Sequence, residues 1–165
     1  MHQVCRSLGL VWADLLREKI FYLGILVKFF LIIGLYPVIQ SEWFVPFIVN
    51  WIEGANSLPW SSYLLSGGDP LAFPYGLIMF LVHLPSTAIG WAIDNFFAIE
   101  YFAHFGFRVS LLLADTFLLI LLLQAFESHW RKILIYYWLS PLVIFVTYWH
   151  GQTDLIPIAL FIYSL

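Results

Sequence analysis

The sequence predicts an all-α integral membrane protein, a polytopic bundle of transmembrane helices with amphipathic juxtamembrane helices in its first external loop. Of the 165 residues, 62% are hydrophobic and only 10% are charged, which leaves too little polar surface to enclose a water-soluble core. Aromatic residues make up 20% of the chain, and Trp and Tyr side chains anchor helices at both headgroup boundaries of a bilayer. We therefore expect a multi-pass protein of the plasma membrane or the endoplasmic reticulum membrane.

The same composition excludes two classes of partner. The basic residues are scattered along the sequence without a basic run, so no nucleic-acid partner is expected. Cys5 is the single cysteine, which excludes a disulfide framework and a thiolate zinc site. The histidines are dispersed, at positions 83, 104, 129 and 150 among others, and they predict no metal site.

Residues 1–165 are interpreted as one transmembrane module that opens with an interfacial helix over 1–19. Its apolar face is predicted to hold Leu8, Leu10, Val11, Leu15 and Leu16, and its polar face Arg6, Asp14, Arg17, Glu18 and Lys19. The first span is predicted over 20–39, because about 20 apolar residues are needed to cross the hydrocarbon.

The external loop over 41–74 is predicted to contain an amphipathic helix. Apolar side chains recur there at helical spacing, opposite Asn50 and Glu53: Trp43, Phe44, Phe47, Ile48, Trp51 and Ile52. The Gly-rich segments and Asp69-Pro70 predict turns. The loop is thus expected to form a structured cover over the external face.

Further membrane segments are expected within 75–165, from apolar runs at 71–93, 105–126, 133–149 and 155–165. The last run has no polar flank, so a C-terminal remainder or a partner subunit is expected to complete the protein. The run at 71–93 has alternative interpretations: it crosses fully, or it re-enters with an interruption at Pro85. In a third alternative, the stretch 94–104 helps to cross.

Charge favours the re-entrant alternative. Lys and Arg near span ends prefer the cytoplasmic side, which places Arg17, Lys19 and the Arg131-Lys132 link there. The region between Phe29 and Phe107 contains no Lys or Arg and is expected to be external. It carries five carboxylates: Glu42, Glu53, Asp69, Asp94 and Glu100. With a re-entrant segment, "YWHGQTD" at 148–154 also becomes external.

Three charged residues lie inside predicted spans: Lys28, Arg108 and Asp115. Charges inside a span are costly and generally face a partner or a polar cavity. Arg108 and Asp115 are seven residues apart and share one helix face, so they either pair through an intermediate group or have separate partners. Lys28 is a candidate partner for Asp115 or for an anionic ligand.

The order of the motifs resembles the N-terminal part of the membrane-embedded C-type glycosyltransferases, including the mannosyltransferases of the GPI and dolichol pathways. After one span come Glu42, a loop with "GGDPLAFPYG", a span bearing Arg108 and Asp115, a basic turn and "HGQTD". "HGQTD" resembles the HGQFD-type motif of these enzymes, although Thr153 stands where an aromatic residue is commoner. "FPYG" resembles their YPP-type motif.

The resemblance implies transfer of a hexose such as mannose from a polyprenyl- or dolichyl-phosphate carrier to an acceptor at the external or lumenal face. It implies Glu42 as catalytic base, with Asp69 as second candidate. The implied substrate-binding residues are His150, Gln152, Asp154, Arg108 and Tyr75. It implies no particular cofactor, and a divalent cation is compatible with such chemistry.

Simpler interpretations stand beside each of these roles. Glu42 can be a solvated span end, Asp69 a turn residue and Asp154 a helix cap. For the protein as a whole, the alternatives to an enzyme are an accessory subunit of a membrane complex or a fragment of a transporter.

Overall fold

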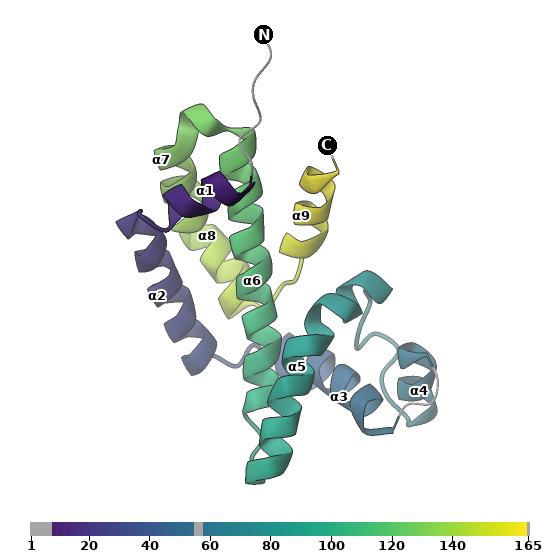
Figure 1. The fold of residues 1–165 in the computed structure, drawn as a ribbon. Helices are drawn as coiled ribbons and strands as arrows, with labels where there is room; N and C mark the ends of the chain where they lie inside the picture. Colours follow the sequence, from purple (N-terminus) through teal and green to yellow (C-terminus); the bar gives the residue numbers. More distant parts are fainter. Residues whose placement is uncertain (1–7, 55–57, 165) are drawn as a thin grey trace. The chain divides into compact units, whose positions relative to one another are not determined.

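The computed structural model describes residues 8–54 and 58–164, and these residues form helices joined by turns, with no strand among them. The prediction of an all-α protein is thus confirmed for this part of the chain. The chain divides into two compact units. Unit 1 comprises Met1–Gly34 and Leu112–Leu165, and unit 2 comprises Leu35–Leu111. Helix α6 (Phe102–Ala125) contributes to both units (Figure 1).

Two described helices are long and apolar enough to cross a membrane, α5 (Leu77–Phe97) and α6. Up to four spans result if each of two bent helix pairs crosses as one. One pair is α2 (Lys19–Gly34) with Ile39–Gly54, bent by 61°, and the other is Glu127–Trp138 with Pro141–Trp149, bent by 45°. Ile39–Gly54 comprises the π-helix η1 (Ile39–Phe44) and α3 (Val45–Gly54).

The apolar segments 20–39 and 133–149 are not continuous helices. Helix α2 ends at Gly34 after 16 residues, about 24 Å of helix, because the backbone before Pro37 disfavours helical geometry. The second segment is divided into α7 (Trp130–Ile133), η3 (Leu134–Trp138), α8 (Pro141–Ile144) and η4 (Phe145–Trp149). Pro141 starts α8 at the break, where Ser140 Oγ accepts a hydrogen bond from Val143 N.

The predicted interruption at Pro85 is wrong, because α5 continues through it. Thr87 Oγ1 donates a 2.8 Å hydrogen bond to His83 O in the same turn. Helices α5 and α6 pack backbone to backbone. A Cβ atom at Gly90 would collide with Phe102 O, and one at Gly106 with Ser86 O, so these glycines permit the close approach.

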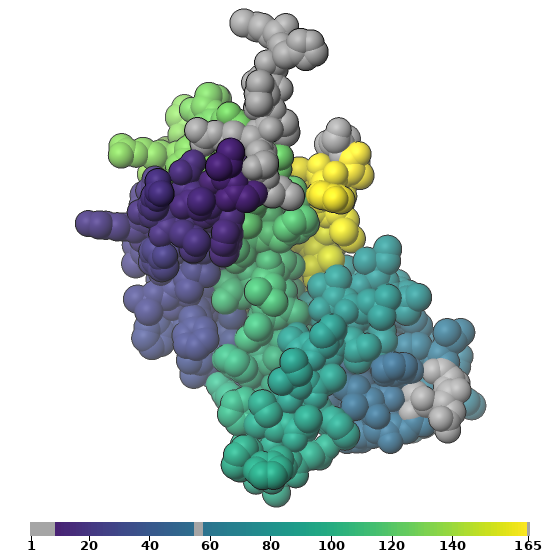
Figure 2. All heavy atoms as spheres, in the orientation of Figure 1, coloured from purple at the N-terminus to yellow at the C-terminus, as the bar shows by residue number. Residues whose placement is uncertain are grey.

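In unit 1, α1 (Leu8–Leu15) packs on the other helices through one face. Val11 and Leu15 are fully buried in a core with Phe21, Leu123 and Trp138, among others. The predicted apolar face is confirmed for these two residues, whereas Leu10 and Leu16 point away from the core and are exposed. Arg6 lies outside the described residues. Figure 2 shows α1 against the green segment that contains α7.

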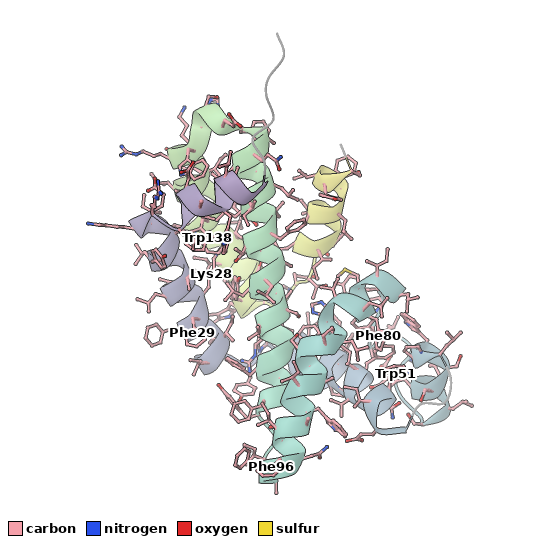
Figure 3. The ribbon with its side chains drawn as sticks, viewed as in Figure 1. Lys28, Phe29, Trp51, Phe80, Phe96 and Trp138 are labelled. Atoms are coloured by element: carbon pink, nitrogen blue, oxygen red, sulfur yellow. The ribbon has the colours of Figure 1, made fainter. Side chains whose placement is uncertain are left out.

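Unit 1 is held together by a buried ion pair. Lys28 Nζ lies 2.7 Å from Asp115 Oδ2, and both side chains are fully buried. Tyr137 and Tyr148 each donate a 2.7 Å hydrogen bond to the same carboxylate. Lys28 Nζ also lies 3.2 Å from the ring centroid of Trp138 (Figure 3), a cation–π contact. Of the two predicted roles for Lys28, the ion pair with Asp115 is the one observed.

These contacts define the directions of the helices in unit 1. Phe21, near the start of α2, shares a core with Leu123 near the end of α6, while Lys28 further along α2 meets Asp115 further back along α6. The two segments are therefore antiparallel. Trp138 stacks on Phe21, and Tyr148 lies beside Lys28, so the chain from η3 to η4 runs in the direction of α2.

Unit 2 is built around a cluster of aromatic rings. Phe47 of α3 stacks on Phe73 with centroids 4.8 Å apart, and Phe80 of α5 meets Phe47 edge-on. Trp60 of α4 (Pro59–Leu65) donates a hydrogen bond to Phe73 O. Within the predicted amphipathic stretch, α3 buries Phe47 and Ile48 and leaves Glu53 exposed, while Trp43 on η1 is 39% exposed.

Replacement of Lys28 by Met should destabilise the protein by about 3 to 5 kcal/mol, because it leaves the buried Asp115 carboxylate without its counter-ion. Asp115→Leu should cost a similar amount for the converse reason. The double variant should recover a large part of the loss. Thermal unfolding of the purified protein in detergent measures all three, and additive losses in the double variant would contradict a direct pair.

Replacement of Gly24 by Ala should lower the melting temperature, because the added Cβ would collide with the indole ring of Trp138. The matched control is Gly34→Ala in the same helix, where a Cβ atom meets nothing within 4 Å. Equal melting temperatures for the two variants would show that α2 does not pack on Trp138 as described.

Candidate functional site

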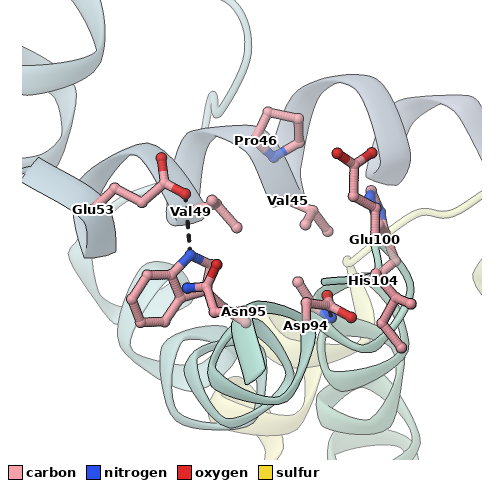
Figure 4. Close-up of a pocket in the computed structure, with 11 residues that line it drawn as sticks. Val45, Pro46, Val49, Glu53, Asp94, Asn95, Glu100 and His104 are labelled. Carbon is pink, nitrogen blue, oxygen red and sulfur yellow. Dashed lines mark hydrogen bonds between the residues drawn. The ribbon is translucent and has the colours of Figure 1, made fainter. Parts of the chain in front are cut away.

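A pocket of about 300 Å³ lies within unit 2, between α3, α5 and the turn into α6 (Figure 4). Its wall combines aliphatic side chains with polar and aromatic ones. The polar and aromatic groups are Glu53, Trp91, Asp94, Asn95, Glu100 and His104, and the aliphatic ones include Val45, Val49 and Ile99. Its size and mixed lining suit a small polar ligand.

Asp94 shapes the pocket by capping α6 from the preceding helix. One carboxylate oxygen accepts hydrogen bonds from Tyr101 N and Phe102 N, at 3.0 and 2.7 Å, and the other accepts from Ala103 N at 2.7 Å. Three otherwise unpaired amides at the start of α6 are thereby satisfied. Ala98 between the helices has a positive φ of 54°. The carboxylate of Asp94 is thus committed to the fold.

The other two carboxylates of the pocket are more available. Glu53 accepts one hydrogen bond from Trp91 Nε1, at 3.1 Å, and its side chain is otherwise exposed. Glu100 is exposed on the opposite side of the pocket and has no hydrogen bond within the described part of the chain (Figure 4). His104 presents a buried Nδ1 that has no hydrogen-bond partner. The carboxylates of Glu53 and Glu100 and the imidazole of His104 can therefore accept a proton, or a hydrogen bond from a hydroxyl group, in this pocket.

Arg108 lies one helical turn beyond His104 and is 4% exposed. Its Nε donates to His104 O at 3.0 Å, its Nη1 donates to Leu35 O, and the guanidinium lies 4.5 Å from the centroid of the Tyr36 ring. Its Nη2 is buried without a partner. No carboxylate among residues 8–54 and 58–164 forms an ion pair with it. Arg108 is therefore a candidate residue for binding an anionic group.

None of the predicted site residues of unit 2, Arg108 included, lines this pocket. Asp69 is an exposed turn residue whose Oδ1 accepts a hydrogen bond from Leu71 N at 2.7 Å. Glu42 is exposed on η1. Tyr75 is half-buried and packs edge-on against Phe44 and Phe73. The simpler interpretation of Asp69 therefore describes its observed contacts, and the catalytic roles of Glu42 and Asp69 stay predictions.

The predicted residues of "HGQTD" belong to unit 1. His150 and Asp154 are exposed, and Gln152 is half-buried. Asp154 precedes α9 (Leu155–Tyr163), but its side chain makes no capping hydrogen bond. Gln152 and Asp154 line a shallow groove of about 220 Å³ with residues of α8, η4 and α9. Gln152 and Asp154 thus share a surface, within a mostly apolar groove.

Glu53, Glu100 and His104 were missed as site residues by sequence reasoning. The available signal was the block of five carboxylates without any Lys or Arg between Phe29 and Phe107. That signal does not show which of the five carboxylates line one pocket, because the pocket lies between α3 and a turn more than 40 residues later in the chain. No group of three or more His, Cys, Asp or Glu residues suited to a metal ion occurs in the described part of the chain.

Comparison with known proteins found no matching family model, no similar curated protein and no similar solved structure.

Replacement of Asp94 by Ala should destabilise the α5–α6 turn by about 1 to 3 kcal/mol, because three amides lose a charged acceptor. Glu100→Ala, in the same turn, is the matched control and should be nearly neutral. Amide hydrogen exchange at Tyr101, Phe102 and Ala103 provides the local readout. Unchanged protection in Asp94→Ala would contradict the capping role.

Proposed function

We propose that this chain is a module of a membrane-embedded C-type glycosyltransferase, which transfers a hexose from a polyprenyl-phosphate carrier to a hydroxyl acceptor. The observation that carries the proposal is Arg108, a buried cation on a membrane-type helix that lacks a counter-ion among the described residues. An anionic headgroup that enters from the lipid phase is the partner such a residue requires.

Arg108 suits a phosphate group in particular. Its Nε and Nη1 are held by backbone carbonyls and its plane is supported by Tyr36, so the guanidinium is fixed before a ligand arrives. The free Nη2 can then donate a charge-assisted hydrogen bond to a phosphate oxygen. In sugar transfer the carrier phosphate leaves as an anion, and a fixed cation stabilises the charge that develops on it.

The pocket beside Arg108 supplies the complementary chemistry. His104 lines the pocket and also accepts the Arg108 Nε hydrogen bond through its carbonyl, so the cation and the carboxylates Glu53 and Glu100 lie along one region of unit 2. A carboxylate can remove the proton from an acceptor hydroxyl as that hydroxyl attacks the sugar carbon. The Trp91 indole is the kind of flat apolar surface against which a sugar ring packs.

Four carboxylates are therefore candidates for the base. Glu42 and Asp69 are implied by the resemblance, and Glu53 and Glu100 are favoured by the pocket. His150, Gln152, Asp154 and Tyr75 stay predicted substrate ligands. The transporter alternative was based on three charged residues inside the spans. Two of them, Lys28 and Asp115, form an ion pair with each other and therefore no longer support it.

Donor binding tests the role of Arg108. Full-length protein in neutral detergent should retain polyprenyl phosphate in native mass spectrometry, and Arg108→Gln should weaken retention at least tenfold, on the order of the loss of one hydrogen bond to a charged group. Arg108→Lys should restore part of the binding, because the charge returns without the fork geometry. The uncharged polyprenol serves as control and should bind all three proteins equally. Equal phosphate binding by wild type and Arg108→Gln would contradict the proposal.

Sugar transfer identifies the base. Membranes with the full-length protein receive polyprenyl-phosphate-linked radiolabelled mannose, and label in a new product is counted for Glu42→Gln, Asp69→Asn, Glu53→Gln and Glu100→Gln. Loss of the base should lower the rate by about 10² to 10⁴, while Glu127→Gln, an exposed carboxylate in unit 1, should retain it. Activity undiminished in all four variants would exclude a catalytic base among them.

A further inference from the structure

The exposed basic residues of the described chain gather at one end of unit 1. Arg17 and Lys19 lie at the turn between α1 and α2, and Arg131 and Lys132 lie on α7, and all four side chains are exposed. Their segments are more than 100 residues apart in sequence. They meet because Val11, Leu15 and Phe21 share one core with Leu134 and the partly buried Trp130. We call these four residues the basic end.

The charges of the basic end are not neutralised by ion pairs within the described residues, where the one salt bridge is that of Lys28 and Asp115. The acidic groups of the same segments are Asp14, Glu18 and Glu127, and His129 lies on the same turn as Arg131. Asp14 and Glu127 are engaged with other residues. The four cations therefore remain able to contact an external anion.

Apolar side chains surround the basic end. Leu10, Trp12 and Leu16 are 59%, 39% and 40% exposed on and beside α1. Further along α2, Leu23, Leu26 and Phe30 are 51%, 52% and 64% exposed, which forms an apolar lateral face that leads away from the cations. A surface for nucleic acid or for an acidic soluble protein would not be flanked by such a face, whereas a helix end at a bilayer surface is.

The depth of the buried ion pair agrees with this placement. Lys28 is nine residues beyond Lys19, about 14 Å along the helix, which is close to half of the roughly 30 Å hydrocarbon thickness. With Lys19 at the headgroups, Lys28 and Asp115 lie near the bilayer centre, where each needs the other.

We propose that the basic end binds the headgroups of anionic phospholipids in the leaflet that it faces. This surface is separate from the proposed sugar-transfer site and does not depend on it. Because both basic segments belong to it, they lie on the same side of the membrane, and the lysine and arginine rule makes that side cytoplasmic. The chain from η3 to η4 then leads away from that side, toward "HGQTD".

The test uses native mass spectrometry of the full-length protein in neutral detergent with phosphatidylglycerol or phosphatidylcholine of identical acyl chains. Wild type should retain phosphatidylglycerol at least tenfold better, since each Lys or Arg near such headgroups attracts them by roughly a factor of five. The variant with Arg17, Lys19, Arg131 and Lys132 all replaced by Gln should lose this preference. The charge-conserving control, with Arg and Lys exchanged at all four positions, should keep it.

Two further measurements distinguish a shared lipid surface from binding by one basic segment and from a small-anion site. The pairs Arg17→Gln with Lys19→Gln, and Arg131→Gln with Lys132→Gln, should each lose part of the preference, and loss confined to one pair would refute a shared surface. Glycerol phosphate in excess should not displace the lipid, because the apolar rim contributes to binding. Displacement would instead identify a small-anion site, and an unchanged preference in the four-residue variant would overturn the proposal outright.

Discussion

The ion pair of Lys28 and Asp115 is the interaction on which unit 1 depends. A lone charge in an apolar helix bundle is strongly unfavourable, and this pair removes two such charges at once. The carboxylate also accepts the hydroxyls of Tyr137 and Tyr148, and the ammonium lies against Trp138. One network thereby connects α2, α6, η3 and η4. It also sets their relative register, since any slide of α2 along α6 would separate the charges, and that register brings the two basic turns to the same end.

Arg108, on the same helix as Asp115, is a buried charge that forms no ion pair among the described residues. It lies two turns before Asp115 and is similarly buried, but among the described residues it contacts backbone carbonyls and Tyr36 rather than a carboxylate. The buried Nη2 of Arg108, which has no hydrogen-bond partner among the described residues, is the group to which the proposed function assigns a ligand.

The carboxylates of the loop region divide in a similar way. Asp69 closes a turn and Asp94 caps α6, so both serve local structure. Glu53 and Glu100 line a pocket that exists because α3 packs its aromatic face into unit 2 and because the cap of Asp94 fixes the turn on which Glu100 lies. The carboxylates that serve structure thus position those that remain available for chemistry.

The sequence by itself determined the helical class, the apolar segments, the amphipathic helix after the first span and the charges that needed partners, because composition and periodicity act locally. It also offered Lys28 as a partner for Asp115 or for an anionic ligand, since few opposite charges exist in the apolar segments, and the structure shows the ion pair. Only the structure showed the breaks at Gly34 and Ser140 and the continuity of α5 through Pro85, and only the tertiary packing brought Glu53 and Glu100 to one pocket. The breaks lie beside Pro37 and Pro141, but a proline alone does not predict a break, because α5 continues through Pro85. The pocket depends on contacts between residues far apart in the chain, which local patterns do not encode. The same reason explains the basic end: its four cations are scattered in the sequence, and the packing of α1 against α7 makes them one surface.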